Sequence, residues 1–523
     1  MPRLDKVWPI LVAGLLAGIA DSSRAQAPPQ GGALPAPVPP VPESDRLAAS
    51  LQPPPLRPTD RPLPINLATA LRLSADRPLV VAAAQASAMV AQAQLERARV
   101  LWVPTLNTGF DYYRHDGGIQ DLTTGRLATV SSNFFYAGGG ANLIVATTDA
   151  IFAPLAARQV LSARQLDVQT AKNDALLATA TAYFTVHEQR GTYAGALDTV
   201  RRAHDLVRRI ETLGAGLVPA AEADRARALL ADLEQQAASA RADWRVSSAR
   251  LTRVLRLDPA AVVVPLEPDH LALTLIDPRQ SVDELVPIGL MNRPELASQQ
   301  AVVRATLARL KQERLRPILP SVLITGFQTP EFLFNGGVFG AGRGDSMNQW
   351  TGRFDMSYQL IWQLEGFGLG NRARIRERRA DQLQAVIEVF KIQDQIAAEV
   401  AEAQALLEAA WVRKGEAERG LREALITYEA NLRGLGETTR VRDMLVLIYR
   451  PQEVVVALQN LQAAYTRYFR TVADYNRAQF QLFHDLGYPA QGLACQRPPG
   501  PILPVNTARP SYLPPAELPP LPP

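Results

Sequence analysis

The sequence predicts an α+β membrane protein in which one structural unit occurs twice. The segment from Arg77-Pro78 to Val103-Pro104 returns as Arg293-Pro294 to Leu319-Pro320, at a constant offset of 216 residues. A fixed offset of this kind indicates an internal duplication. Each copy continues with two strand-like runs and then two long helical stretches, so the fold class rests on the repeat, on the strands and on the length of the helices.

The elements of the two copies are predicted in the same order. The first repeat covers residues 65–280, with strands at about 104–115 and 133–148 and long helices at about 152–212 and 219–256. The second repeat covers residues 281–488, with strands at about 319–330 and 349–363 and long helices at about 370–434 and 451–487. The first helix of each copy would be about 80–90 Å long, at 1.5 Å per residue. Helices of this length need lateral partners.

Apolar residues recur every 3.5 residues along these helices, which predicts coiled-coil packing. The last helix carries Leu458, Leu461, Tyr465, Tyr468, Val472, Tyr475, Gln479, Leu482 and Leu486 at this period. The helix before it carries Leu383, Val386, Phe390, Gln393, Ala397, Val400, Gln404, Leu407 and Trp411. We interpret both series as packing seams and not as ligand sites.

The run from Trp350 to Trp362 alternates between apolar and polar residues over its whole length. Soluble strands are usually about 5–6 residues long, whereas a membrane-spanning strand needs about 9–11 residues with aromatic residues near the interfaces. Trp350, Tyr358 and Trp362 are therefore candidates for an aromatic girdle. Four strands cannot close a barrel in lipid, where an open edge is forbidden. We expect several chains to share one barrel, with the helices continuing it as a tube.

The two ends of the chain have a different composition from its body. Arg3, Lys6 and the apolar run from Val7 to Ala20 predict a signal peptide over residues 1–25, cleaved after Ala25. Of the 41 prolines, 25 lie in residues 28–64 and 489–523. Residues 26–64 are accordingly predicted to be a disordered linker, and residues 489–523 a disordered tail.

Several functional classes are disfavoured by the sequence. A net charge of +4 on 523 residues argues against a nucleic-acid partner. The five histidines are scattered and form no zinc motif. Gly340, Gly342 and Gly344 around Arg343 superficially resemble a phosphate loop, but no Lys-Ser or Lys-Thr follows, so a flexible loop at the outer end of the barrel is predicted. The sequence predicts no enzyme activity, no metal and no cofactor.

The order of these elements resembles that of the TolC-like outer-membrane efflux proteins, the outer membrane factors. The motifs that carry the resemblance are Asn292-Arg293-Pro294-Glu295-Leu296, Trp102-Val103-Pro104-Thr105-Leu106, and the end of the last helix from Tyr475-Asn476-Arg477-Ala478 to Asp485-Leu486-Gly487. Each motif is weak alone, but their duplicated order covers the whole body of the chain.

The resemblance implies a homotrimer with a twelve-stranded barrel, four strands per protomer, in outer-membrane lipid of a Gram-negative cell. Twelve helical segments would form a tunnel in the periplasm. The channel would conduct substrates passively to the exterior from a periplasmic adaptor and an inner-membrane transporter, in tripartite efflux or type I secretion. The alternative is a soluble periplasmic coiled-coil adaptor or scaffold, for which the aromatic face of residues 350–362 would be costly in water.

The helix tips are the predicted functional regions. Glu222 and Glu453 begin the returning helices, where the family usually carries an acid. Three copies of Glu453 would make a carboxylate ring that favours cations, although an acid in a first helical turn is also stabilised by the helix dipole alone. Val456 replaces a second acid of the family pattern.

The loops at the two tips differ. Arg442 and Arg450, together with Arg440, are candidates for ion pairs across a closed entrance, or for simple solvated arginines. The candidates for adaptor docking are Gly214, Gly216, Leu217, Val218, Gly434 and Gly436, with plain interhelical turns as the alternative.

Overall fold

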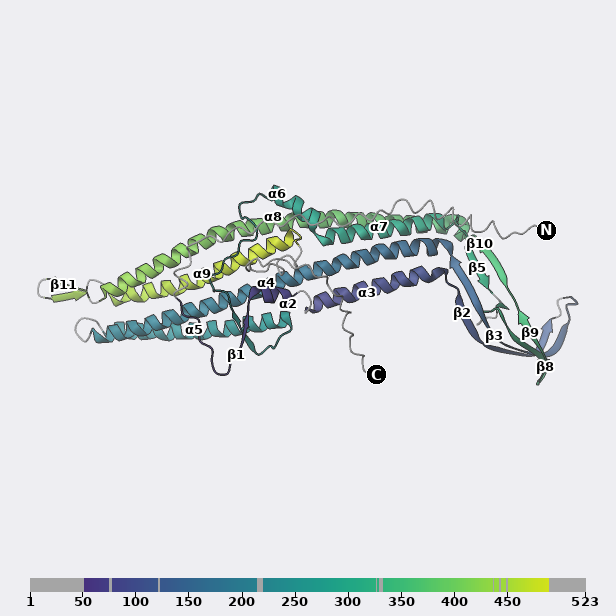
Figure 1. Cartoon of the computed structure of the whole chain (residues 1–523), viewed down its shortest axis with the longest axis horizontal. Coiled ribbons are helices and arrows are strands. Elements are labelled where there is room, and N and C mark those ends of the chain that lie inside the picture. Colours follow the sequence, from purple (N-terminus) through teal and green to yellow (C-terminus); the bar gives the residue numbers. More distant parts are fainter. Residues whose placement is uncertain are drawn as a thin grey trace, which may run out of the picture. The chain divides into compact units, whose positions relative to one another are not determined.

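The computed structural model describes residues 51–74, 78–120, 123–213, 220–325, 327–328, 333–435, 437–441, 444–447 and 450–488. Within them the chain is mostly helical and carries one six-stranded curled sheet, with three two-stranded sheets besides (Figure 1). The α+β class predicted from the sequence is therefore confirmed. The predicted signal peptide and the predicted tail lie outside the described residues.

The sheet has six strands, all antiparallel to their neighbours, which occupy four positions side by side. The strands are β2 (Thr105–Gln120), β3 (Leu127–Ala146), β5 (Ser321–Thr325), β8 (Gly336–Arg343), β9 (Ser346–Phe354) and β10 (Ser357–Ile361). On one side β3 pairs with β2, and on the other with both β5 and β8. The fourth position is filled by β10 beside β5 and by β9 beside β8. Within the described chain, the outer edges of β2 and of β9 and β10 pair with no strand.

The second half of the sheet differs from the predicted strand pattern. A short hairpin of β6 (Phe327–Gln328) and β7 (Leu333–Phe334) separates β5 from β8. Gly340 and Gly342 lie inside β8 and not in the predicted flexible loop, which is a correction. The physical reason is close approach, because a Cβ on Gly342 would lie 1.8 Å from the carbonyl oxygen of Ser346. Only Gly344, at φ +58°, lies in the turn between β8 and β9.

The helices form two long hairpins. The first is α4 (Thr147–Thr212) with α5 (Ala220–Leu255), and the second is α8 (Leu369–Gly434) with α9 (Pro451–Asp485). Shorter helices complete the bundle: α3 (Leu79–Arg99) packs on α4, and α7 (Pro294–Leu315) packs on both α4 and α8 (Figure 1). Both α4 and α8 have 66 residues, while α5 has 36 and α9 has 35. None of the described helices is both long enough and apolar enough to cross a membrane.

The remaining elements connect or flank these helices. They are β1 (Arg61–Ile65), α2 (Leu67–Leu73), the 3-10 helix η2 (Val100–Trp102), β4 (Ala261–Pro265), α6 (Val282–Asn292), the 3-10 helix η3 (Glu365–Gly368), β11 (Thr438–Val441) and β12 (Met444–Leu447). The hairpin of β11 and β12 joins α8 to α9. The turn η3 joins β10 to α8 and lies where the sheet meets the helices.

The coiled-coil seam predicted for α9 is confirmed, since all nine of its residues are buried. The seam predicted for α8 is only partly buried. Val400, Gln404 and Leu407 are buried, whereas Leu383, Phe390 and Trp411 are exposed. The 3.5-residue period shows which face of α8 is apolar, but in a single chain part of that face has no partner.

Residues 51–65 are ordered against the helices, although the sequence predicts a disordered linker over 26–64. The strand β1 pairs with β4 in parallel, from Arg61 opposite Ala261 to Ile65 opposite Pro265. Just before β1, Arg241 of α5 donates to Asp60 at 2.8 Å, and both side chains are largely buried. The prolines suggested disorder, but Pro62 and Pro64 are compatible with a short edge strand.

Candidate functional site

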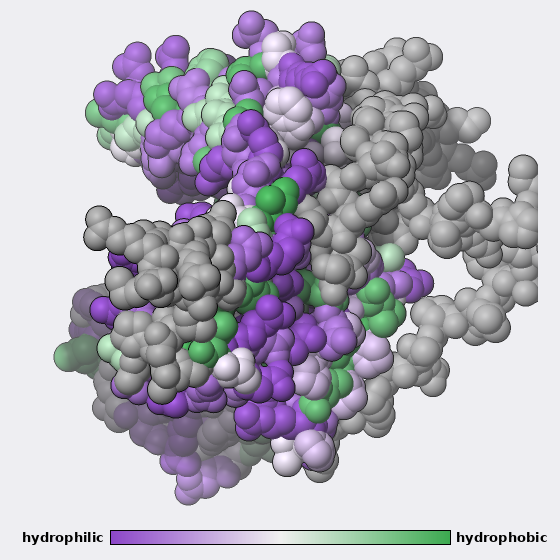
Figure 2. Space-filling model, turned by 90° about the vertical axis from the view of Figure 1, so that its left-hand side faces the viewer, coloured by the Kyte–Doolittle hydropathy of each residue, from purple (hydrophilic) through white to green (hydrophobic). Residues whose placement is uncertain are grey.

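The start of α9 carries the acidic residue Glu453. This residue lies in the first turn of α9 and is exposed, while Arg450 is the N-cap of that helix. Both line an open groove of about 450 Å³ between the ends of α8 and α9. The side-chain amide of Asn431 donates to the backbone carbonyl of Glu453 at 3.5 Å, and in the described chain the Glu453 carboxylate forms no ion pair. Figure 2 looks onto this end of the helices and shows mainly hydrophilic described residues there.

Glu222, the corresponding acid of α5, has a different environment. Arg225, one helical turn further on, donates to its carboxylate at 2.7 Å, and the Glu222 side chain is only 15% exposed. The charge of Glu222 is therefore neutralised within its own helix. The two acids have equivalent positions in the sequence, but their electrostatic environments differ in the structure.

The structure describes only part of the predicted tip residues. Gly434 is the last residue of α8 and is buried. Gly214, Gly216, Leu217, Val218, Gly436 and Arg442 lie outside the described residues. Arg440 lies in β11, of which the structure describes the backbone alone.

The predicted girdle residues lie on one exposed, apolar face of the sheet. Trp350 and Tyr358 are 55% and 69% exposed, and Trp362 donates its indole N–H to the carbonyl of Ile318 at 3.1 Å. The same face continues across the strands, because the ring of Phe135 lies 6.3 Å from that of Phe110 and 5.9 Å from that of Trp350. The other face carries polar groups such as the pair of Arg353 and Asp355, at 2.7 Å.

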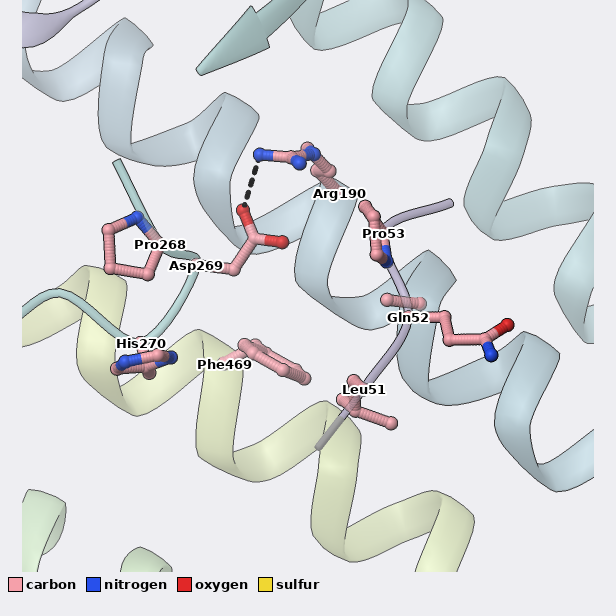
Figure 3. A pocket seen from close by; sticks show the side chains of 9 residues that line it. Leu51, Gln52, Pro53, Arg190, Pro268, Asp269, His270 and Phe469 are labelled. Atoms are coloured by element: carbon pink, nitrogen blue, oxygen red, sulfur yellow. Dashed lines mark hydrogen bonds and ion pairs between the residues drawn. The ribbon is translucent and has the colours of Figure 1, made fainter. Parts of the chain in front are cut away.

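A buried charged cluster that the sequence analysis missed lies between α4 and the segment after β4. Arg190 donates to Asp269 at 3.2 Å, and the ring of His187 is 3.8 Å from the same carboxylate. Burial raises the pKa of Asp269 to about 6 and lowers that of His187 to about 3. Arg190 and Asp269 line a cavity of about 290 Å³ that residues 51–53 partly cover (Figure 3). In the sequence His187-Glu188 is only an incomplete zinc motif, and no local pattern predicts its neighbour Asp269.

A second missed cluster joins four helical elements. Arg293, just before α7, pairs with Glu399 of α8 and approaches Asp485 of α9 at 3.7 Å. His484 lies between Asp485 and Asp174 of α4, at 2.8 and 2.9 Å. Arg293 and Asp485 belong to two of the motifs that carry the family resemblance, and the structure brings these two motifs together.

No arrangement for catalysis or metal binding is apparent in the part of the chain that the structure describes. There, no three His, Cys, Asp or Glu side chains are grouped so that they could hold a metal ion. The buried carboxylates considered above are each paired with an arginine or a histidine.

Comparisons with known proteins define the fold. No family model and no curated protein matches the sequence. The structure is similar to the Campylobacter jejuni CmeC outer membrane channel, at a TM-score of 0.61 and 15% identity, covering 81% of this chain and 85% of that one. It is also similar to the outer membrane protein VceC of Vibrio cholerae, at a TM-score of 0.60 and 14% identity, covering 80% and 96%.

A third similar structure is the open state of the Neisseria gonorrhoeae MtrE outer membrane channel. Its TM-score is 0.61 and its identity 14%, over 81% of this chain and 89% of that one. The chain therefore has the fold of the TolC-like outer-membrane efflux proteins, and the resemblance inferred from its sequence is confirmed at the level of the fold.

Proposed function

We propose that three copies of this chain form an outer-membrane channel, in which twelve strand positions close one barrel and the long helices continue it as a periplasmic tunnel. Residues 1–25 would direct export as a signal peptide. The channel conducts substrates passively from a periplasmic adaptor and an inner-membrane transporter to the exterior. The sheet, the helices and the similar structures support this proposal, and the sheet does so most directly.

The sheet carries the proposal because it is incomplete in one chain. Both of its outer edges lack a strand partner among the described residues, and one of its faces is apolar and exposed. Unpaired edges invite further strands, and backbone groups in lipid have to be paired. A closed ring of several such sheets satisfies both edges and places the apolar face, with Phe110, Trp350 and Tyr358, against lipid.

The helices support the same assembly. Exposed apolar residues lie on α8, at Leu383, Ile387 and Phe390, and on α3, at Leu79, Val80, Met89 and Val90. On α8 the three residues are spaced four and three positions apart, so they share one face of the helix, and an exposed apolar face is typical of an interaction site. The near-equal lengths of α4 and α8, and of α5 and α9, support the internal duplication, which would give six similar units around one pore.

The similar structures support the channel, while the adaptor and the pump are proposed from the family resemblance of the sequence. CmeC and MtrE are named outer membrane channels. A soluble coiled-coil adaptor remains the rival function, and the exposed aromatic face of the sheet counts against it, because water would contact Phe354, which is 71% exposed.

The test is to express the whole chain, separate the membranes and purify the protein in detergent. We expect it in the outer-membrane fraction as a trimer that forms conducting pores in planar bilayers. Deletion of residues 105–120, the strand β2, should abolish both the trimer and the pores. Recovery of the wild type as a soluble periplasmic monomer would contradict the proposal.

A further inference from the structure

The junction between β10 and α8 presents Phe367 to solvent on an unusual backbone. Phe367 has the highest relative exposure of any large apolar residue described, 103%, and a positive φ of +55°. Its neighbours Gly366 and Gly368 also have positive φ, at +51° and +89°. A bulky residue with positive φ is a genuine outlier, and such outliers are kept where the surrounding structure holds them for a purpose.

The turn around Phe367 is held by specific contacts. The side chain of Asn371, which is buried, accepts the backbone N–H of Glu365 at 2.9 Å. The carboxylate of Glu365 pairs with Arg374 at 2.7 Å. A side chain at Gly370 would collide with Glu365, since its Cβ would lie 2.8 Å away. The conformation of this turn is therefore fixed by side-chain contacts.

Apolar residues surround Phe367 along the chain. Leu360 and Trp362 precede it on the exposed apolar face of the sheet, and Leu364 and Leu369 flank it in the turn, all of them exposed. The proposed lipid-facing surface therefore continues beyond the last strand and into the first residue of α8.

Arginines follow this apolar segment. Residues 372, 374, 376, 378 and 379 are all arginine. Arg374 and Arg378 pair with nearby carboxylates, but Arg372, Arg376 and Arg379 are exposed and form no ion pair in the described chain. Their spacing of four and three residues places them on one face of α8. A cation in the first turn of a helix opposes the helix dipole, so Arg372, in the first turn of α8, does not stabilise the helix through its charge.

We propose that this junction binds anionic phospholipid of the periplasmic leaflet, with Phe367 inserted among the acyl chains and Arg372, Arg376 and Arg379 contacting the phosphates. The proposal rests on the outer-membrane function proposed above. At 1.5 Å per residue, Arg372 lies about 4.5 Å beyond Leu369 along the helix, Arg376 about 10 Å and Arg379 about 15 Å. The headgroup layer is about 5–8 Å thick on each side, and long arginine side chains can reach back into it.

The position of Phe367 can be tested with a spin label on the full-length trimer in phosphatidylglycerol-containing liposomes. Cys495 is first replaced by Cys495→Ser, so that Phe367→Cys carries the only label. Two matched sites are Tyr358→Cys, on the apolar face of the sheet, and Arg413→Cys, exposed on α8 away from the junction. We expect labels at 367 and 358 to be accessible to oxygen and protected from a water-soluble nickel complex, with the reverse at 413.

The outcomes separate this inference from the proposed function. If the label at 358 is in lipid but the label at 367 is in water, the inference is overturned and the proposed function is not. The same holds if the label at 367 is immobilised and accessible to neither reagent. Labels at both 358 and 367 in water contradict the membrane barrel itself.

The role of the arginines can be tested by comparing phosphatidylglycerol with phosphatidylcholine. We expect phosphatidylglycerol to raise the melting temperature of the detergent-solubilised trimer, and 1 M salt to remove most of this rise because it screens exposed charges. The triple variant Arg372→Gln, Arg376→Gln, Arg379→Gln should lose the rise while keeping the phosphatidylcholine value, and each single variant should weaken the lipid response about fivefold in lipid concentration. The control is Arg413→Gln, Arg419→Gln, Arg433→Gln on the same helix.

Two results would overturn the lipid assignment. One is a triple variant that responds to phosphatidylglycerol as the wild type does. The other is a triple variant that no longer forms trimers in either lipid, because the arginines would then be pairing with acids of a neighbouring chain.

Discussion

Trp244 of α5 donates its indole N–H to the backbone carbonyl of Val263 in β4, at 3.0 Å. The backbone N–H of Val263 in turn donates to the hydroxyl of Ser248 at 3.1 Å. A two-stranded parallel sheet is marginal by itself, and here two side chains of α5 replace a third strand along β4. These two hydrogen bonds hold β4 against α5, and the strand β1 is held to the bundle through its pairing with β4.

We predict that Trp244→Phe destabilises the protein by about 1–3 kcal/mol, because the carbonyl of Val263 loses its partner in a buried position. The melting temperature of the purified trimer measures the effect. The control is Trp411→Phe in α8, which should lower the melting temperature less, because the Trp411 indole N–H donates no hydrogen bond in the described chain and phenylalanine keeps an aromatic ring near Arg279. Equal effects of the two substitutions would contradict the role assigned to Trp244.

Gly191 and Gly195 let α4 approach α9 closely. A Cβ on Gly191 would lie 2.4 Å from the ring of Phe469, and one on Gly195 would lie 2.8 Å from Tyr465. We predict that Gly191→Ala costs about 1–3 kcal/mol through overpacking. Combining it with Phe469→Leu should recover part of the loss.

Gly415 and Gly420 of α8 are matched controls, since nothing lies within 4 Å of a Cβ added at either position. Alanine there should stabilise the protein by about 0.5–1 kcal/mol, because alanine favours the helix. The comparison is made by thermal unfolding of Gly191→Ala, of its combination with Phe469→Leu, of Gly415→Ala and of Gly420→Ala. A destabilising Gly415→Ala together with a neutral Gly191→Ala would sink the prediction.

His484 should make the stability of the protein depend on pH in the alkaline range. Burial by itself would lower its pKa, but hydrogen bonds to Asp174 and Asp485 prevail and raise it from 6.5 to about 9. A histidine with a raised pKa contributes stability that is complete below about pH 6.5 and is lost as the pH rises through about 9. The raised pKa corresponds to on the order of 3 kcal/mol.

The measurement is the difference in melting temperature between the wild type and His484→Gln at several pH values. We expect a large difference at pH 6 that disappears above about pH 9 to 10. His204→Gln is the control, because its ring is 55% exposed and pairs with Glu234 only at the surface. A difference for His484→Gln that is independent of pH would show that its charge is not involved.

Glu453 and Glu222 should differ in their effect on conduction. We predict that Glu453→Gln lowers the preference for cations in single-channel recordings, because its carboxylate is exposed and unpaired in the described chain. Glu222→Gln should have a smaller effect, since Arg225 neutralises that acid. Unchanged selectivity in Glu453→Gln would count against a carboxylate ring.

The sequence predicts those features best that depend on neighbouring residues in the chain. The nine seam residues of α9 can be assigned from the spacing of apolar residues alone, because burial of one helix face imposes its period on the sequence. The exposed positions of α8, such as Leu383 and Phe390, follow the same period, but the period does not reveal that nothing in the described chain covers them. Period identifies an apolar face and does not identify what covers it.

By itself the sequence predicted a duplicated order of elements, and it determined the long helices and the apolar residues from Trp350 to Trp362, because these follow from the spacing of neighbouring residues. Only the tertiary structure decided the pairing of β1 with β4, about 200 residues apart, and the junction of Arg293, His484 and Asp485. The tertiary structure also showed that Glu222 differs from Glu453, because Glu222 is paired with Arg225. These contacts join distant segments, and the energy of a buried ion pair or strand pairing depends on a geometry that no local pattern records.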